Sequence, residues 1–319
     1  MELKLINGHN QIVFSDEEEK EIIKSYLSGE SLRSLMKRYG VNIKSLWRLL
    51  DREDIDHSRG NLRTYTFFYP NGIFDPSSEN EIKEKITEIS CLHNNIKYTI
   101  NEKYFNDIDT EEKAYILGFL YADGNNYLDK TQISIGLEER DKYILEKMNE
   151  CFEYSKTLDF LDLSKKTTFG YHYKNMYRLV IYNKYMSNVL NLRGMVPRKS
   201  LVLEFPRWLN PILYKHFIRG YFDGDGSISK GNRRGTLVTI TSTERFCQAI
   251  SDIVAKEIEI SSGIYDASSH NGITKVFSLS GNNVCKKFLD WLYEDSTIYL
   301  QRKHDRYIEY YNLNNSLSA

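Results

Sequence analysis

Two stretches of the chain, 102 residues apart, share one arrangement, in which an apolar run ends on an aspartate followed by glycine. Residues 114–127 read AYILGFLYADGNNY, and residues 216–229 read HFIRGYFDGDGSIS. Aligning the two stretches superimposes three pairs of residues: Asp123 on Asp225, Gly118 on Gly220, and Gly124 on Gly226. Such a repeat predicts two similar halves related by pseudo-twofold symmetry.

The repeated run is expected to form a helix that is buried on all sides, because residues 114–120 leave no polar face. A single copy could be only a core helix ended by an Asp-Gly turn. The second copy argues against that interpretation, since a buried helix seldom ends on a carboxylate without a partner. Gly118 and Gly220 would let the two backbones approach closely. We therefore expect parallel helices, with Asp123 and Asp225 meeting at their C-terminal ends.

Two carboxylates at that position would repel each other, and both helix dipoles would add negative charge there. Bound cations resolve this repulsion. Carboxylate and carbonyl oxygens are the ligands that hard divalent metals such as Mg²⁺ prefer. Metal ions clamped between two acids suit in-line attack on a phosphodiester bond.

From residue 110 onward, the apolar pattern predicts the order α-β-β-α-β-β-α twice, followed by a last helix. This order predicts an α+β fold in which residues 110–196 form the first repeat and residues 197–319 the second. Residues 59–109 contain Gly, Pro, Ser and Asn breaks and are interpreted as a linker.

The first 58 residues are predicted to form a small all-α domain. Apolar residues recur at helical spacing in three short segments, and a Gly-containing turn separates the second segment from the third. This pattern predicts a helix-turn-helix, with Trp47 among the inward residues of the third helix. Its outward face would offer DNA-binding groups: Asn42, Lys44, Ser45, Arg48 and Arg52. The alternative is a three-helix bundle that binds nothing.

Composition excludes some classes of protein. A net charge of −1 does not indicate a nucleic-acid binder, so that hypothesis rests on the arrangement of residues. The four cysteines form no C-x-x-C pair and are expected to be reduced thiols. No apolar run is long enough to span a membrane, and the N-terminus lacks the apolar core of a signal peptide. We therefore expect a protein of the bacterial or phage-infected cytoplasm, or of an organelle, rather than a secreted one.

The segments ILGFLYADG and IRGYFDGDG resemble the two signature motifs of the LAGLIDADG homing endonucleases, in their single-chain form. The resemblance spans about residues 100–312 and includes MVPRKSLVLEFP before the second motif and IYLQRKHDRYIEYY after the second repeat. Family members of phage and bacterial type also often carry an N-terminal helix-turn-helix. The resemblance implies an Mg²⁺-dependent, site-specific double-strand DNA endonuclease of the kind used in intron homing. It would act as a monomer through two pseudo-symmetric active sites.

The resemblance also implies roles for residues of this chain. Asp123 and Asp225 would share two or three divalent ions, assisted by the carbonyls of Ala122 and Gly224. Lys199 and Lys303 would order the attacking water and stabilise charge on the phosphate. A shift of the alignment by one residue would give these roles to the neighbouring arginines, Arg198 and Arg302. The first motif has Tyr121 where the second has Asp223, so we expect two half-sites that are not equivalent.

In this family the two sheets lie along the DNA major groove, which a two-stranded ribbon fits. Side chains alternate along a strand, so one face of each sheet would hold the residues that read the bases. For the first half we select Asn126, Lys130, Gln132, His172, Lys174 and Arg178. For the second half we select Ser229, Lys230, Arg233, Arg234, Thr236, Ser269 and Lys275.

An alternative function is a DNA- or RNA-binding protein of the same fold that does not cut, such as a transcription regulator or an intron-splicing maturase. Regulators of this fold would be expected to lose one or both acids. Here both acids and both lysines are present, which favours the enzyme. A maturase could keep the acids, so the sequence leaves that activity open.

Overall fold

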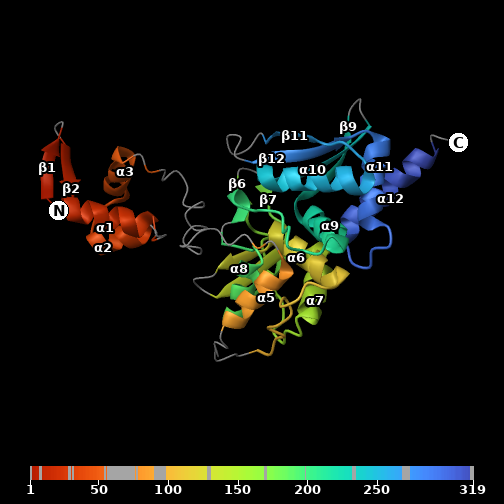
Figure 1. The fold of residues 1–319 in the computed structure, drawn as a ribbon, viewed down its shortest axis with the longest axis horizontal. Helices are drawn as coiled ribbons and strands as arrows, with labels where there is room; N and C mark the ends of the chain where they lie inside the picture. The colour runs from red at the N-terminus through yellow and green to blue at the C-terminus, as the bar shows by residue number, and fades with distance from the viewer. Residues whose placement is uncertain are drawn as a thin grey trace. The chain divides into compact units, whose positions relative to one another are not determined.

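The structure is a computed structural model. It describes residues 2–6, 9–27, 30, 32–53, 55, 76, 78–89, 98–127, 131–168, 171–197, 199–231, 235–267 and 274–316. The chain divides into two compact units, Met1–Asp75 and Pro76–Ala319 (Figure 1). Within the described part of the chain, no helix is long and apolar enough to cross a membrane.

The first unit contains the three predicted helices and a hairpin that the sequence did not predict. Its elements are β1 (Glu2–Ile6), β2 (His9–Val13), α1 (Asp16–Leu27), α2 (Leu32–Tyr39) and α3 (Ile43–Arg52). Gly40 ends α2 with a φ of +62°, and the next residue, Val41, is buried in the core of the unit. This is the tight turn expected between the two helices. Trp47 corrects one prediction, because it is 38% exposed rather than inward.

The second unit contains the predicted duplication. The first repeat comprises α6 (Glu111–Asp123), β3 (Asn125–Tyr127), β4 (Gln132–Glu138), α7 (Lys142–Cys151), β5 (Asp159–Leu161), β8 (Met176–Tyr182) and α8 (Lys184–Leu192). The second comprises α9 (Tyr214–Asp225), β9 (Gly226–Gly231), β10 (Gly235–Ser242), α10 (Glu244–Ile258), β11 (Gly263–Asp266), β12 (Lys275–Ser280) and α11 (Asn282–Tyr293). The strand orders, β3-β4-β8-β5 and β9-β10-β12-β11, are equivalent. The α+β fold and its α-β-β-α-β-β-α order are confirmed.

Three further elements lie outside this repeated order. The helix α12 (Gln301–Ser316) follows the second repeat, as predicted. A small hairpin, β6 (Thr167–Thr168) with β7 (Tyr171–His172), lies between β5 and β8 of the first repeat. The helix α5 (Glu79–Glu88) precedes the first repeat.

The helix α5 corrects the interpretation of residues 59–109 as a linker. Residues from Pro76 onward belong to the second unit. Glu79 of α5 accepts two hydrogen bonds from the fully buried guanidinium of Arg193, at 2.8 and 2.9 Å, which ties α5 to the end of α8. Such a bidentate pair is among the stronger polar contacts in proteins. The isolated motif EIKEKITEIS carried no sign of this partner.

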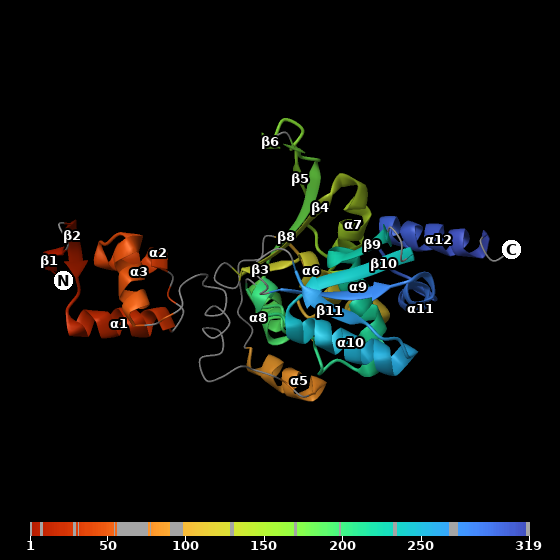
Figure 2. The ribbon, with the colours of Figure 1, turned by 90° about the horizontal axis from the view of Figure 1, so that it is seen from above.

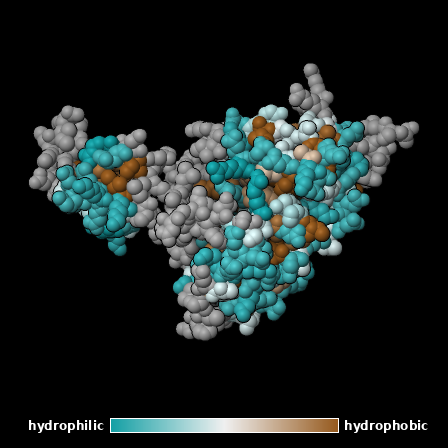
Figure 3. All heavy atoms as spheres, viewed as in Figure 1, coloured by the Kyte–Doolittle hydropathy of each residue, from teal (hydrophilic) through white to brown (hydrophobic). Residues whose placement is uncertain are grey.

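Among the residues that the structure describes, each four-stranded sheet of the second unit has one face covered by helices and one face without them. The helices α10 and α11 pack on the second sheet, and α7 and α8 pack on the first (Figure 1). Along β4, Ile133, Ile135 and Leu137 are buried towards the helices, and the residues between them are partly exposed. The face of the second unit that Figure 3 shows is mostly hydrophilic, with hydrophobic patches.

The two motif helices, α6 and α9, lie against each other at the centre of the second unit (Figures 1 and 2). A Cβ atom added to Gly118 would lie 2.0 Å from the carbonyl oxygen of Phe217. One added to Gly220 would lie 2.0 Å from that of Tyr115. The predicted close approach is therefore present on both helices, and only glycine permits it at these two positions.

Candidate active site at the paired helix ends

Asp123 and Asp225 are the last residues of α6 and α9, and the two helix ends meet. A Cβ atom built on Gly224 would lie 2.3 Å from the Ala122 Cβ and 3.2 Å from the Asp123 Oδ2. Both aspartate side chains nevertheless remain accessible to solvent. The structure thus brings together the two acids that the sequence selected, at a position that a ligand can reach.

The electrostatics of this pair fit the predicted repulsion. Desolvation raises the pKa of Asp123 to about 6, and the charge of Asp225 adds to the increase. Desolvation also raises the pKa of Asp225, while Lys199 and Lys303 oppose that change. Two carboxylates held together in this way are stabilised as anions by any cation placed between them.

Lys199 and Lys303 lie at the same place in the two halves, one beside each helix end. Lys199 Nζ donates hydrogen bonds to the carbonyl oxygens of Ala122 at 3.0 Å and Gly124 at 2.5 Å. Lys303 Nζ donates to the carbonyl of Phe222 at 2.6 Å and to that of Gly226. Burial lowers the pKa of each lysine to about 8. Each amine therefore places positive charge at the negative end of a helix dipole.

The neighbouring arginines were the alternative candidates for this role. Arg302 donates to the buried carboxylate of Asp141 at 2.9 Å instead of reaching the helix ends. Arg198 lies outside the described residues. In the second half, the geometry therefore favours Lys303 over Arg302.

Asp223 and Tyr121 occupy equivalent positions but make different contacts. The fully buried carboxylate of Asp223 accepts hydrogen bonds from the hydroxyls of Tyr115 and Tyr293, at 2.8 and 2.6 Å, and from the Leu300 amide at 2.7 Å. The hydroxyl of Tyr121 donates to the Arg193 carbonyl. Each side chain holds the segment that leads to the lysine of its own half, but through different chemistry. The motif sequence indicated this asymmetry without indicating the partners.

A pocket of about 190 Å³ lies beside the acids, next to Asp225 and Lys199. Its other lining residues include Thr241, Ser242 and Thr274. The Thr274 hydroxyl is buried and finds no hydrogen-bond partner among the residues that the structure describes. The pocket therefore offers polar groups and space for water close to one acid.

The donor set at the helix ends fits a divalent metal that binds oxygen. Two carboxylates and the nearby Gly224 carbonyl are hard ligands, and they would leave most coordination positions to water or to substrate. Within the described ranges, no cluster of three or more His, Cys, Asp or Glu residues is present. The Ala122 carbonyl, expected as a further ligand, accepts a hydrogen bond from Lys199.

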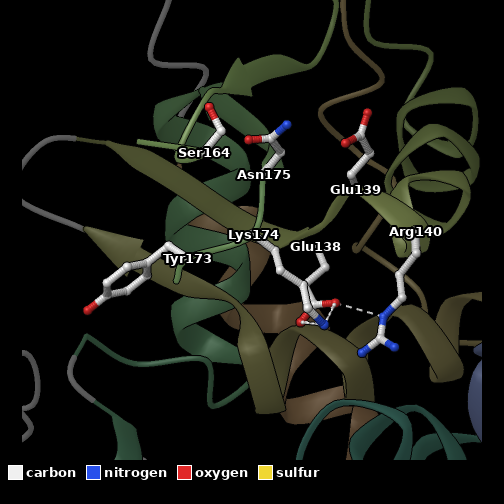
Figure 4. Close-up of a pocket in the computed structure, with 7 residues that line it drawn as sticks. All are labelled: Glu138, Glu139, Arg140, Ser164, Tyr173, Lys174 and Asn175. Atoms are coloured by element: carbon white, nitrogen blue, oxygen red, sulfur yellow. Dashed lines mark hydrogen bonds and ion pairs between the residues drawn. The ribbon is translucent and has the colours of Figure 1, made fainter. Parts of the chain in front are cut away.

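A second pocket, of about 540 Å³, lies at the far end of the first sheet (Figure 4). Glu138 at the end of β4 forms ion pairs there with Lys174 at 3.2 Å and with Arg140 at 2.7 Å. Lys174 was selected as a DNA-reading residue, and it is exposed as that role requires. Its charge is partly neutralised by Glu138.

The structure corrects three of the DNA-reading residues selected from the sequence. Asn126 is 1% exposed and donates to the carbonyls of Ser187 and Met195. Thr236 is 5% exposed and donates hydrogen bonds to the side-chain oxygen of Asn282. Ser45 is 6% exposed and donates hydrogen bonds to the side-chain oxygen of Asn42. Their polar groups are satisfied inside the protein, so they do not face a ligand.

Lys275 is also corrected by the strand register, because it lies on the helix-covered face with Phe277, where it pairs with Asp266 at 2.5 Å. The side chain of Lys230 lies outside the described part of the structure. Besides Lys174 and Lys275, the selected residues that are at least partly exposed are Gln132, His172, Arg178 and Ser229 in the sheets and Asn42, Lys44, Arg48 and Arg52 in the first unit. Arg52 forms an ion pair with Glu19. Lys130, Arg233, Arg234 and Ser269 lie outside the described residues.

Sequence reasoning missed the residues that share the open face of the first sheet. Asn125 and Tyr127 stand on either side of Asn126, opposite Ser134 and Gln132 of β4. Tyr182 lies opposite Gln132 on the other side and is 58% exposed. The alternation of apolar residues in QISIGLE was the signal that could have fixed the facing of the strand.

Comparisons with known proteins agree with this fold. Residues 213–290 match the family model described as the LAGLIDADG-like domain. No curated protein matches the chain. The solved structure of full-length DUF199/WhiA from Thermatoga maritima is 17% identical, with a TM-score of 0.40, and the match covers 74% of this chain and 66% of that one.

Two solved homing endonucleases are similar at the same level. The I-LtrWI LAGLIDADG homing endonuclease bound to target DNA is 11% identical, with a TM-score of 0.43, and the match covers 68% of this chain and 92% of that one. The I-GzeII LAGLIDADG homing endonuclease in complex with its DNA target is 13% identical, with a TM-score of 0.43, covering 64% and 90%. Residues 213–290 therefore match a LAGLIDADG-like domain, and the first repeat has the same order of elements as the second.

Proposed function

We propose that this chain is a monomeric, site-specific endonuclease that cuts double-stranded DNA with the help of bound Mg²⁺. The observation that carries the proposal is the accessible pair Asp123 and Asp225 at the meeting point of α6 and α9. Cutting both strands requires two sets of reactive groups. The duplicated fold supplies them, with one lysine beside each acid.

In this proposal, Asp123 and Asp225 hold two or three divalent ions between them, with the Gly224 carbonyl as a further oxygen donor. Bound there, the ions would polarise the phosphate and lower the pKa of the attacking water. Lys199 and Lys303 would order that water and stabilise charge on the phosphate. The Ala122 carbonyl accepts one hydrogen bond from Lys199 Nζ, which leaves its second lone pair for a ligand.

The first unit would lengthen the recognised DNA site or prolong residence on it. Lys44 and Arg48 of α3 are exposed and suit contact with phosphates and base edges. The near-zero net charge means that such contacts would have to be local rather than part of a uniformly basic surface.

Selection from a random duplex library tests this proposal. The purified full chain is incubated with the library in Mg²⁺, and in parallel in Ca²⁺. Cut ends are sequenced from the first reaction and bound fragments from the second. We expect the cut ends to converge on one long site with staggered breaks. A bound site without cut ends in either metal would overturn the nuclease proposal.

One observation favours the alternative of a non-cleaving DNA- or RNA-binding protein. Both lysine amines are bonded to backbone carbonyls at the helix ends, including the Ala122 carbonyl that a metal would use. In a regulator or an intron-splicing maturase the lysines could serve only this structural role. The uncut but bound site described above is the result that this alternative predicts.

A further inference from the structure

The open face of the second sheet carries hydroxyl and apolar side chains. Side chains directly opposite each other in an antiparallel pair share a face. Opposite pairs on the open face are Leu237 with Ser229, Thr239 with Ser278, and Thr241 with Val276. All six are at least partly exposed, whereas Val238 and Ile240 between them are fully buried towards the helices.

Two of the charged residues of this sheet are placed on the other face. Within the described strands β9 to β12, only three residues have charged side chains: Lys230, Asp266 and Lys275. Lys275 and Asp266 stand opposite each other, in line with the buried Phe277. The side chain of Lys230 lies outside the described part of the structure. Apart from that residue, the described strands bring no charge to the open face of the second sheet.

The open face of the first sheet differs. Arg178 stands opposite Gly136 on β4 and opposite Asp159 on β5, and it is exposed. Gln132 lies on the same face, between Tyr127 and Tyr182. Arginine pairs with guanine and glutamine with adenine through two hydrogen bonds each, so this face has side chains for base-specific contacts.

We propose that the two sheets read different kinds of half-site, and this proposal rests on the proposed DNA recognition. The second sheet reads an A·T-rich half-site through the C5-methyl groups of thymine, which pack against Leu237, Thr239 and Val276. The hydroxyl groups of this sheet can accept or donate a hydrogen bond to any of the four bases. They therefore add affinity with little discrimination between bases. The first sheet reads a half-site that contains a guanine, which pairs with Arg178.

Replacing thymine by deoxyuridine tests the proposal, because it removes only the methyl group. The bound site is first selected from random duplexes with the full chain in Ca²⁺. Each half-site is then synthesised with deoxyuridine in place of thymidine, and the Kd of the full chain for each DNA is measured in Ca²⁺. In the A·T-rich half we expect a loss of about fourfold for each methyl group that packs against the sheet. In the guanine-containing half we expect less than about twofold.

Protein variants assign each half-site to its sheet. In the Val276→Ser variant, the loss of affinity caused by deoxyuridine should become smaller at the base that Val276 contacts. In the Arg178→Met variant, the preference for guanine should disappear. The matched control is Ile212→Ser, which removes an exposed apolar side chain before the other end of α9 and should change neither preference.

The outcomes separate this inference from the proposed function. Failure to enrich any site would overturn DNA recognition and with it this inference. A site that binds equally well with deoxyuridine in both halves would overturn only the methyl readout. The methyl readout would also be overturned if the Val276→Ser variant lost as much affinity on deoxyuridine substitution as the wild type does. Because binding alone is measured, the presence or absence of cutting does not affect the conclusion.

Discussion

At the scale of the residue, Asp223 shows how a motif position can serve the site without touching a ligand. Its carboxylate is fully buried and accepts three hydrogen bonds from α6, α11 and the segment before α12. The hydroxyl of Tyr121, at the same position of the first motif, donates a hydrogen bond to the Arg193 carbonyl. The two positions therefore differ in how much stability they supply.

Substitution of these residues tests that difference. Asp223→Ala leaves two hydroxyls and an amide unpaired inside the protein, so we expect the free energy of unfolding to fall by at least about 3 kcal/mol. Tyr121→Phe removes one hydrogen bond and should cost about 1 kcal/mol. Urea unfolding of both variants measures the contrast. Equal losses would contradict the assigned contacts.

A second residue-scale prediction concerns pH. Burial, and then the Arg219 charge, lower the pKa of His216 to about 4, and the ring accepts a hydrogen bond from Arg219 at 3.1 Å. Between pH 6.5 and 4 the unfolded state binds this proton and the folded state does not. Stability should therefore fall as the pH falls through this window, by up to about 3 kcal/mol.

The matched variant is His216→Gln, which keeps a hydrogen-bond acceptor but does not titrate. We expect its stability to decrease less steeply over the same pH window, as measured by urea unfolding at several pH values. The account of His216 fails if the two proteins show the same pH dependence.

At the scale of the element, the contact between α6 and α9 fixes the position of the acids. Gly118→Ala would place a Cβ atom 2.0 Å from the Phe217 carbonyl oxygen, so the helices would have to separate. We expect a loss of more than about 2 kcal/mol in unfolding free energy, despite the better helix propensity of alanine. Cleavage should weaken in parallel.

Gly136→Ala is the control for this prediction. Its added Cβ atom would lie 3.5 Å from the flexible end of Met176, an ordinary contact. We expect a change of less than about 1 kcal/mol. Tolerance of Gly118→Ala at the level of this control would show that the helix backbones are not in contact as described.

The repeated motifs made the element-scale fold predictable, while single strands and isolated segments did not. Gly118, Gly220 and the two acids follow from the motif because each is repeated at the same place. Asn126 was misplaced because a shift of one residue moves a side chain to the opposite face of a strand. The attachment of α5 to the second unit was missed because its partner is Arg193, more than a hundred residues away in the sequence. No local pattern encodes such a partner.

At the scale of the whole molecule, the first unit would add DNA contacts to the recognition and cutting that we propose for the second unit. We expect the double variant Lys44→Ala, Arg48→Ala to bind the selected site more weakly and with a smaller salt dependence, the slope falling by about one for each lost phosphate contact. The position of the cut should not change. Binding titrations over a range of salt concentrations measure the effect.

The control removes the same charge from the same unit at another place. Lys20 and Lys24 of α1 are exposed, and their double substitution by alanine should leave the salt dependence nearly unchanged. If both double variants behave like the wild type, the first unit is the three-helix bundle that binds nothing.

Strand cleavage by aspartate variants tests the central claim most directly. Asp123→Asn and Asp225→Asn keep the size of the side chain but remove its charge, and Asp295→Asn is the control, because Asp295 is exposed and its left-handed backbone suits asparagine. On the selected site in Mg²⁺, we expect the wild type and the control to cut both strands. Each of the other two variants should bind within about threefold of the wild type and cut less than about one hundredth as fast. Full cleavage by Asp123→Asn or Asp225→Asn would contradict the account.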